Sequence, residues 1–201
     1  MFRFWCALIL LTALFPLRLF ATPDETIIAG LYARGLAGDK AAVVSCVAAL
    51  EQVLIAQPND QLARAYLGSA ETLRSRDLPF GWEKLTTLRR GIALMDEAAA
   101  AVPNDARVQL IRAVTYEAFP AVLGRRQTAR AAFAKLVDVV SRDPKKLQPA
   151  DQQLLFLNAG EAAANAGDKT RAIDLWRRGA AIAADPRLTR ELHDALHSAP
   201  N

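Results

Sequence analysis

Arg125 and Arg126 are adjacent cations in the stretch "FPAVLGRRQTARAAF" (residues 119–133), directly after a proline and a glycine. The start of a helix attracts anions, and guanidinium groups placed there can bind a carboxylate. Arginines in a first turn do not stabilise the helix itself, because acidic residues are preferred at that end. The stretch therefore has two interpretations: a loop that binds an anion, or a turn between helices with two solvated arginines.

His193 and His197 are the only histidines of the chain, and they lie four residues apart in "ELHDALH". On a helix this spacing places both imidazoles on one face, and the pattern is similar to the His-Glu-x-x-His motif of zinc proteases. Asp194 is shorter than the glutamate of that motif, however, and no third histidine can complete the site. A polar terminal helix explains the same residues, so we predict no metal site and no cofactor.

Cys46 lies within the apolar segment "AAVVSCVAAL", which is typical of a buried, inert thiol. Triads that depend on histidine are excluded elsewhere in the chain, since no further histidine exists. The glycines spell neither a dinucleotide-binding loop nor a phosphate-binding loop. We therefore nominate no catalytic residue and expect a protein that is not an enzyme.

Composition and charge fit one folded domain. The chain has 201 residues, of which 52% are hydrophobic, and a net charge of +4. The charges alternate along the predicted helices and do not cluster, so no nucleic-acid partner is expected.

Residues 1–21 have the pattern of a signal peptide: Arg3, an apolar run from Phe4 to Leu17, and the small residue Ala21. The run is shorter than the roughly 20 residues of a membrane span. We expect export to the periplasm or secretion, with no stable span once the leader is cleaved. The alternative is a protein anchored in the membrane by an uncleaved N-terminus.

Helical spacing of apolar residues dominates the remainder, and signals for strands are weak. Four prolines recur with a nearly constant period, separated by 45, 41 and 42 residues: Pro58, Pro103, Pro144 and Pro186. Because proline ends a helix and Asp60 and Asp105 can cap the next one, this period predicts stacked helical hairpins.

The last unit has bulky Phe156 and small Gly160 on its first helix, a glycine–aspartate turn, and then Ala172 and Trp176 on its second. This segment, "FLNAGEAAANAGDKTRAIDLWRRGAAIAADP", resembles a tetratricopeptide repeat, and looser matches cover nearly all of residues 24–187. The resemblance implies an all-α, right-handed solenoid. We expect residues 22–201 to form about four helix-turn-helix hairpins, at 24–58, 60–103, 105–144 and 148–186, with a capping helix at 187–198.

The units are longer than the standard repeat of about 34 residues. In the two middle units the excess lies between the paired helices, in "RDLPFGWEK" and "FPAVLGRRQ". Stacked hairpins would bring the turns 76–82 and 119–126 to one side of the solenoid, which we name the loop edge. Its candidate site residues are Phe80, Trp82, Leu123, Arg125 and Arg126. The apolar ones are either exposed or tucked under their own hairpins.

Tetratricopeptide proteins commonly bind a peptide or helix in the concave groove formed by the first helix of each unit. Carried over to this sequence, the resemblance implies a mostly apolar groove lined by Tyr32, Ala65, Ser69, Leu110, Val114, Leu157 and Glu161. Its occupant would be an amphipathic segment of a partner or the C-terminal helix of the chain itself.

Two functions follow from the sequence. The first is a non-catalytic scaffold module of the bacterial cell envelope that binds a partner protein in the groove. The alternative is a carrier or sensor of a small anionic or lipidic ligand at the loop edge.

Overall fold

The computed structural model describes residues 24–198, so the predicted signal peptide, residues 1–21, lies outside the described residues. The described part contains α-helices and two short 3₁₀-helices, and no strand. In chain order they are α1 (Glu25–Leu36), α2 (Lys40–Ala56), α3 (Gln61–Asp77), α4 (Trp82–Ala101), α5 (Ala106–Glu117), η1 (Ala121–Leu123), α6 (Arg126–Arg142), η2 (Pro144–Lys146), α7 (Pro149–Asn165), α8 (Lys169–Ala180) and α9 (Pro186–Ser198).

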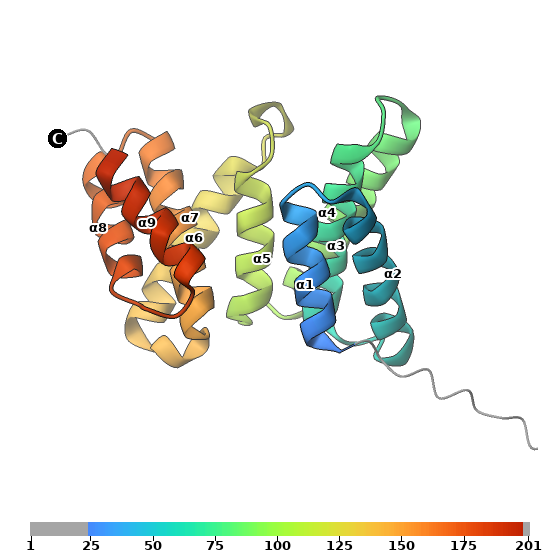
Figure 1. Ribbon diagram of the computed structural model, residues 1–201, viewed down its shortest axis with the longest axis horizontal. Coiled ribbons are helices and arrows are strands. Elements are labelled where there is room, and N and C mark those ends of the chain that lie inside the picture. The colour runs from blue at the N-terminus through green and yellow to red at the C-terminus, as the bar shows by residue number, and fades with distance from the viewer. Residues whose placement is uncertain (1–23, 199–201) are drawn as a thin grey trace, which may run out of the picture.

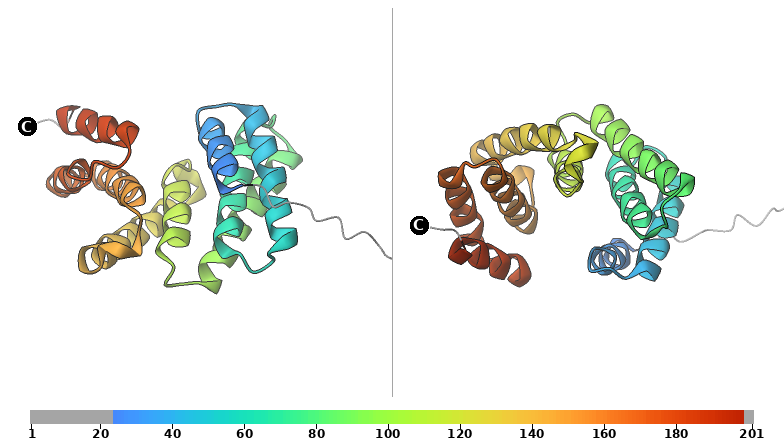
Figure 2. Two further views of the ribbon diagram at one scale, coloured as in Figure 1. Left: turned by 60° about the horizontal axis from the view of Figure 1, so that its bottom comes forward. Right: turned by 90° about the horizontal axis from the view of Figure 1, so that it is seen from above.

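The helices α1 to α8 pair in sequence order into four hairpins, and each hairpin packs on the next (Figure 1). Seen from above, the stack is an open arc with α1 and α9 at its two ends (Figure 2). The first helix of each hairpin lies on the inner side of the arc, and α1, α3, α5, α7 and α9 contact one another in that order. The all-α solenoid expected from the sequence is confirmed.

Aspartate residues cap the N-termini of helices α2, α3, α5 and α8. Asp39, Asp60 and Asp168 each accept a hydrogen bond from the backbone N–H three residues on, at 3.0, 2.9 and 3.1 Å. Asp105 does the same for α5, at 3.0 Å from the N–H of Val108. A side-chain oxygen in this position satisfies an N–H group that has no partner within the helix, which fixes where the helix begins.

The α3/α4 hairpin is held by an approach of backbone to backbone. Gly68 of α3 faces Gly91 of α4, and a β-carbon added at either position would lie 2.6 Å from the carbonyl oxygen of the other. The side chains of Met95 and Thr72 close the space around the two glycines. The crossing of these helices therefore requires residues without a side chain at both positions.

The α7/α8 hairpin uses the same principle with an aromatic partner. The indole of Trp176 lies directly on Gly160, so a β-carbon there would overlap the ring. The indole N–H of Trp176 donates to the carbonyl oxygen of Leu157 at 3.2 Å. A large ring and a missing side chain thus fix the register of α8 on α7.

The C-terminal helix α9 closes the end of the stack against α7 and α8. Leu188 and Leu192 are buried, and Leu192 packs on Gly179 of α8. The buried amide of Gln153 donates to the Thr189 hydroxyl at 3.0 Å and accepts from the N–H of Asp185 at 2.7 Å. In this position α9 is a cap, and it does not fill the groove as the alternative interpretation supposed (Figure 2).

A glycine packed against a neighbouring helix and a glycine facing open space should respond oppositely to alanine substitution, as measured by the free energy of unfolding. Gly160→Ala forces the Trp176 ring away and should lower the free energy of unfolding by about 2 kcal/mol, a typical cost of overpacking. Gly30→Ala, inside α1 with nothing within 4 Å, should raise it by about 0.5–1 kcal/mol through helix propensity. Urea unfolding followed by circular dichroism measures both changes. Equal effects of the two substitutions would contradict the packing described here.

Candidate functional site

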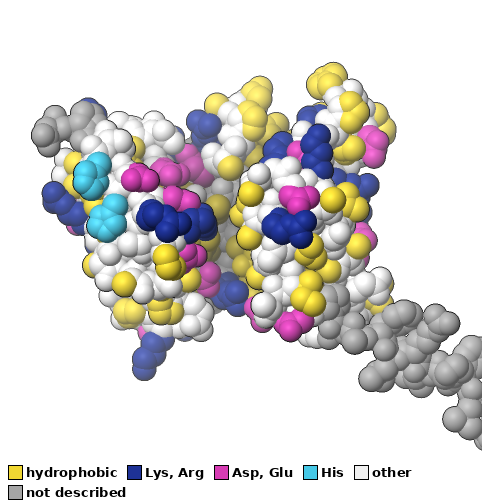
Figure 3. Space-filling model, viewed as in Figure 1, with side chains coloured by type: hydrophobic (Ala, Val, Ile, Leu, Met, Phe, Trp, Pro, Cys, Tyr) yellow, Lys and Arg dark blue, Asp and Glu magenta, His cyan; other side chains and the backbone are white. Residues whose placement is uncertain are grey.

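The concave face of the arc forms a groove whose floor is α5 and whose walls are α1 and α3 on one side and α7 and α9 on the other. Figure 3 looks into this groove between the two halves of the molecule, and both acidic and basic side chains line its walls. The inner helices carry the side chains that a ligand in the groove would meet, so the site is built from these five helices.

A cavity of about 460 Å³ opens at the N-terminal end of the groove, between α1, α2 and α3. Aliphatic side chains of these helices and the rings of Tyr32 and Tyr66 form most of its wall. Glu25, Asp60 and Arg107 supply charged groups to the same wall. An apolar cavity with a few charged groups is the usual form of a binding pocket.

A chain of hydroxyl groups fixes the position of Tyr32. Its phenol oxygen lies 2.7 Å from the Ser69 hydroxyl, which lies 2.8 Å from the Thr115 hydroxyl. Thr115 in turn donates to the carbonyl oxygen of Ile111 at 2.9 Å. Burial raises the pKa of Tyr32 to about 12, so the phenol keeps its proton at neutral pH and can donate to Ser69. The chain joins α1, α3 and α5 beneath the floor of the groove, since Ser69 and Thr115 are buried.

Arg107 connects three inner helices beside the cavity. Its Nε lies 3.2 Å from a carboxylate oxygen of Asp151 on α7, and its Nη2 lies 3.9 Å from one of Glu25 on α1. Burial raises the pKa of the Asp151 carboxyl, and the nearby charge of Arg107 opposes that rise. The ring of Tyr66 stands edge-on to that of Tyr32, with centroids 5.2 Å apart, next to this ion-pair group.

Glu117, Glu161 and Glu191 give the C-terminal part of the groove an acidic wall, on α5, α7 and α9. The Glu161 side chain is accessible, but neighbouring side chains desolvate its carboxylate and raise its pKa, and the charges of Glu191 and Glu117 raise it further. Glu117 is only 8% exposed, and neither carboxylate oxygen has a hydrogen-bond partner within residues 24–198. Glu191 pairs with Arg187 at 2.7 Å. Negative charge at this wall is thus only partly compensated.

The structure divides the residues expected to line the groove. Tyr32 and Val114 are half-buried and Glu161 is exposed, so these three are accessible. The other four are buried and belong to the core, which corrects the expectation that a partner would touch them: Ala65, Ser69, Leu110 and Leu157. Packing of the neighbouring helices buries these positions in the core and removes them from the groove surface.

At the loop edge, Phe80 and Trp82 are exposed, while Leu123 is half-buried and packs on the core. Arg125 lies 3.5 Å from Asp96, with its guanidinium 5.3 Å from the centre of the Tyr116 ring. Arg126 donates to the carbonyl oxygen of Phe119 at 3.2 Å. Both arginines are therefore engaged by partners inside the protein, and their contacts give no support to an anion site.

The remaining candidates for chemistry lie apart from the groove. His193 and His197 are exposed on α9, where Nδ1 of His197 donates to the carbonyl oxygen of His193 at 2.7 Å. Cys46 is buried, and burial raises the pKa of its thiol to about 11. Among the residues that the structure describes, no group of three or more His, Cys, Asp or Glu side chains could hold a metal ion.

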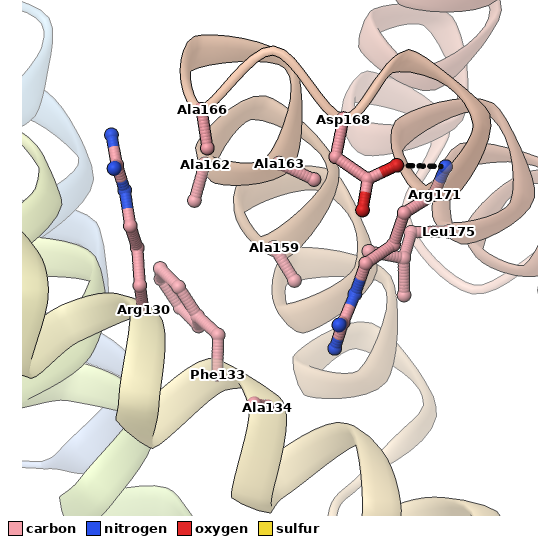
Figure 4. Close-up of a pocket in the computed structure, with 10 residues that line it drawn as sticks. All are labelled: Arg130, Phe133, Ala134, Ala159, Ala162, Ala163, Ala166, Asp168, Arg171 and Leu175. Carbon is pink, nitrogen blue, oxygen red and sulfur yellow. Dashed lines mark hydrogen bonds between the residues drawn. The ribbon is translucent and has the colours of Figure 1, made fainter.

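A smaller crevice of about 160 Å³ lies between α6, α7 and α8. Figure 4 shows the alanines of α7 on one side of it, Phe133 of α6 on the other, and the side chains of Arg130 and Arg171 at its rim. Asp168 accepts from the Arg171 backbone N–H at 3.1 Å as the cap of α8, so it faces its own helix. The crevice follows from the short side chains of α7, and it lies outside the groove.

Sequence reasoning missed Arg107, Asp151, Tyr66 and Glu117. One signal was present: Glu25, Arg107 and Asp151 lie in the first turns of three inner helices, with alternating charge. First turns of inner helices lie at the same end of the groove, so opposite charges in them indicate ion pairs between hairpins. No comparable signal marks Glu117.

The acidic wall predicts a dependence of stability on pH. Glu161→Gln should raise the urea midpoint at pH 7, because the ionised carboxylate is disfavoured in the folded state. Below a pH of about 4.5, the ordinary value for glutamate, Glu161 is protonated in both states and the two proteins should converge. Asp174→Asn, an exposed change on α8, is the matched control with little effect. A gain for Glu161→Gln that persists at pH 3 would contradict the electrostatic origin.

No family model matches the sequence, and a search of curated proteins finds no match. Among solved structures, the chain is similar to a thermophilic TPR protein from Thermus thermophilus, with a TM-score of 0.58. The two are 17% identical, and the match covers 85% of this chain and 81% of that one. The likeness shows that the described helices have the fold of a tetratricopeptide-repeat protein.

Proposed function

We propose that the protein is a non-catalytic interaction module that binds a segment of a partner protein in the groove. The cavity of about 460 Å³ at the N-terminal end of the groove is the observation that carries this proposal. It offers apolar and aromatic surface on helices fixed by the hydroxyl chain from Tyr32 to Thr115. Such a preformed pocket suits an apolar anchor residue on a peptide or helix.

Charge in the groove favours a partner segment that also carries lysine or arginine. The acidic wall of Glu117, Glu161 and Glu191 lies on the helices that follow the cavity along the groove. A segment with an apolar residue at one end and basic residues at the other would satisfy both parts. This complementarity would set the orientation of the segment and help to exclude acidic ones.

We place this module in the bacterial cell envelope, on the strength of the leader pattern in residues 1–21. In the part of the chain that the structure describes, no helix is long and apolar enough to cross a membrane. The leader pattern supports the periplasm or the medium as the location, with a retained N-terminal anchor as the alternative.

Filling the cavity should abolish partner binding. Ala29 is exposed on α1 and lines the cavity, so Ala29→Trp would occupy the anchor site without disturbing the core. Ala33→Trp, also exposed on α1 but outside the cavity wall, is the matched control. In-cell crosslinking of the C-terminally tagged chain, with mass spectrometry of the envelope fraction, measures the yield of each crosslinked protein.

We expect a dominant crosslinked protein whose yield falls more than about tenfold with Ala29→Trp, since loss of one anchor contact costs roughly 1.4 kcal/mol or more. Ala33→Trp should leave the yield unchanged. Equal yields from all three chains would contradict binding at the cavity.

Leader cleavage is a separate prediction. N-terminal sequencing of the protein purified from cells should begin at Thr22, the residue after the small Ala21. A protein that begins at Met1 and stays with the membrane fraction would contradict the cleaved form and favour the N-terminal anchor.

A further inference from the structure

Two loop tips expose large apolar side chains that do not contribute to the core. Phe80 is 91% exposed and Trp82 is 72% exposed at the α3–α4 turn, and Val122 is 90% exposed at the α5–α6 turn. The interpretation that these side chains tuck under their own hairpins is therefore wrong. Exposed aromatic and aliphatic side chains gathered at one edge indicate an interaction surface for a protein, a membrane or a ligand.

Both tips project from the same edge of the solenoid. Figure 1 shows that the α3–α4 and α5–α6 turns extend beyond the shorter turns of the other hairpins. Figure 3 shows them as two separate projections with hydrophobic side chains at their ends. The extra residues in these two turns thus lift the apolar side chains clear of the rest of the fold.

The loops that carry the tips are held in place. The Lys84 ammonium donates to the backbone carbonyls of Ser75, Arg76 and Leu78, at 2.9, 3.0 and 2.9 Å. The other loop is fixed by Arg126 on the carbonyl of Phe119 and by Gly124, whose φ of 66° favours glycine. The apolar side chains are therefore presented on rigid supports, which lowers the entropy cost of binding.

Basic residues lie directly behind both tips. Three basic side chains of these segments are already paired with carboxylates: Arg76 with Asp77, Arg90 with Glu51 and Glu71, and Arg125 with Asp96. Within residues 24–198, Lys84, Arg89 and Arg126 have no carboxylate at ion-pair distance, so their positive charge is uncompensated. The Arg89 guanidinium lies 6.0 Å from the centre of the Trp82 ring. Apolar tips backed by positive charge match the layers of an anionic bilayer, in which lipid chains lie beneath phosphate groups.

We propose that the loop edge binds the surface of an anionic lipid bilayer, with Phe80, Trp82 and Val122 inserted among the lipids. The charges of Lys84, Arg89 and Arg126, which no carboxylate of residues 24–198 neutralises, would then lie on the side of the phosphates. The groove then stays accessible to a protein partner, so this surface is distinct from the proposed binding site. The apolar side chains stand on two projections with open space between them. A fluid lipid surface can adapt to both projections, whereas a folded partner protein would need a surface of complementary shape.

Trp82 provides a local test. The full chain carrying Trp5→Phe is mixed with vesicles of equal parts phosphatidylglycerol and phosphatidylcholine, with and without brominated acyl chains that quench tryptophan. The only other tryptophan is Trp176, which is buried on Gly160. We expect quenching of Trp82 and a blue shift of its emission. Because the signal is local, attachment of the chain through its apolar N-terminus alone would leave Trp82 unquenched and overturn the proposal.

Two matched double variants test whether lipid binding depends on the apolar side chains of the loop tips or on any exposed apolar side chain. Phe80→Ser with Val122→Ser should raise the lipid concentration for half-maximal quenching roughly tenfold, because the inserted apolar area is lost. Val44→Ser with Ile55→Ser removes exposed apolar side chains from α2, at 60% and 70% exposure, and should change nothing.

Two further outcomes are decisive. Quenching that is as strong with pure phosphatidylcholine vesicles would overturn the role of the basic residues. Loss of a crosslinked protein in the Phe80→Ser, Val122→Ser chain, with no quenching in the parent, would overturn the bilayer in favour of a protein partner. Circular dichroism should show the serine variants folded, since all four side chains that they replace are exposed.

Discussion

The contact of Gly68 with Gly91 is the constraint on which the architecture depends most. The backbones of α3 and α4 touch at this point, with no side chain between them. This contact fixes how the helices of the second hairpin cross, and the neighbouring hairpins pack on the surfaces that it leaves. Gly160 and Trp176 set the last hairpin by a related contact. Glycine positions thus fix how the helices of these two hairpins pack, and the stacking of the hairpins forms the arc and its groove.

The sequence was sufficient for the architecture because its signals are local. A proline or an aspartate cap acts within a few residues of itself, so Asp60, Asp105 and the regular prolines mark the helix ends directly. The spacing of small and large residues predicted how the two helices of a hairpin pack on each other. These are contacts between segments close in the sequence, which a pattern can record.

The groove was harder to predict because its surface depends on contacts between hairpins. Leu110 and Leu157 were expected to line the groove, yet packing against other helices buries both in the core. Arg125 was a candidate for binding an anion until the fold brought Asp96 and Tyr116 beside it. Whether a side chain is covered or already paired depends on residues in another unit, and no spacing within one unit carries that information.

The hydroxyl chain from Tyr32 through Ser69 to Thr115 also has a mechanical consequence. Its short bonds cross three successive inner helices, while the ion pair of Arg107 with Asp151 continues the connection to α7. Bending that widens the concave side must lengthen all of these hydrogen bonds and the ion pair, because each joins one inner helix to the next. The same load therefore passes through every one of them. Their failure under load would begin at the weakest link, and the arc would then open at one joint instead of flexing evenly.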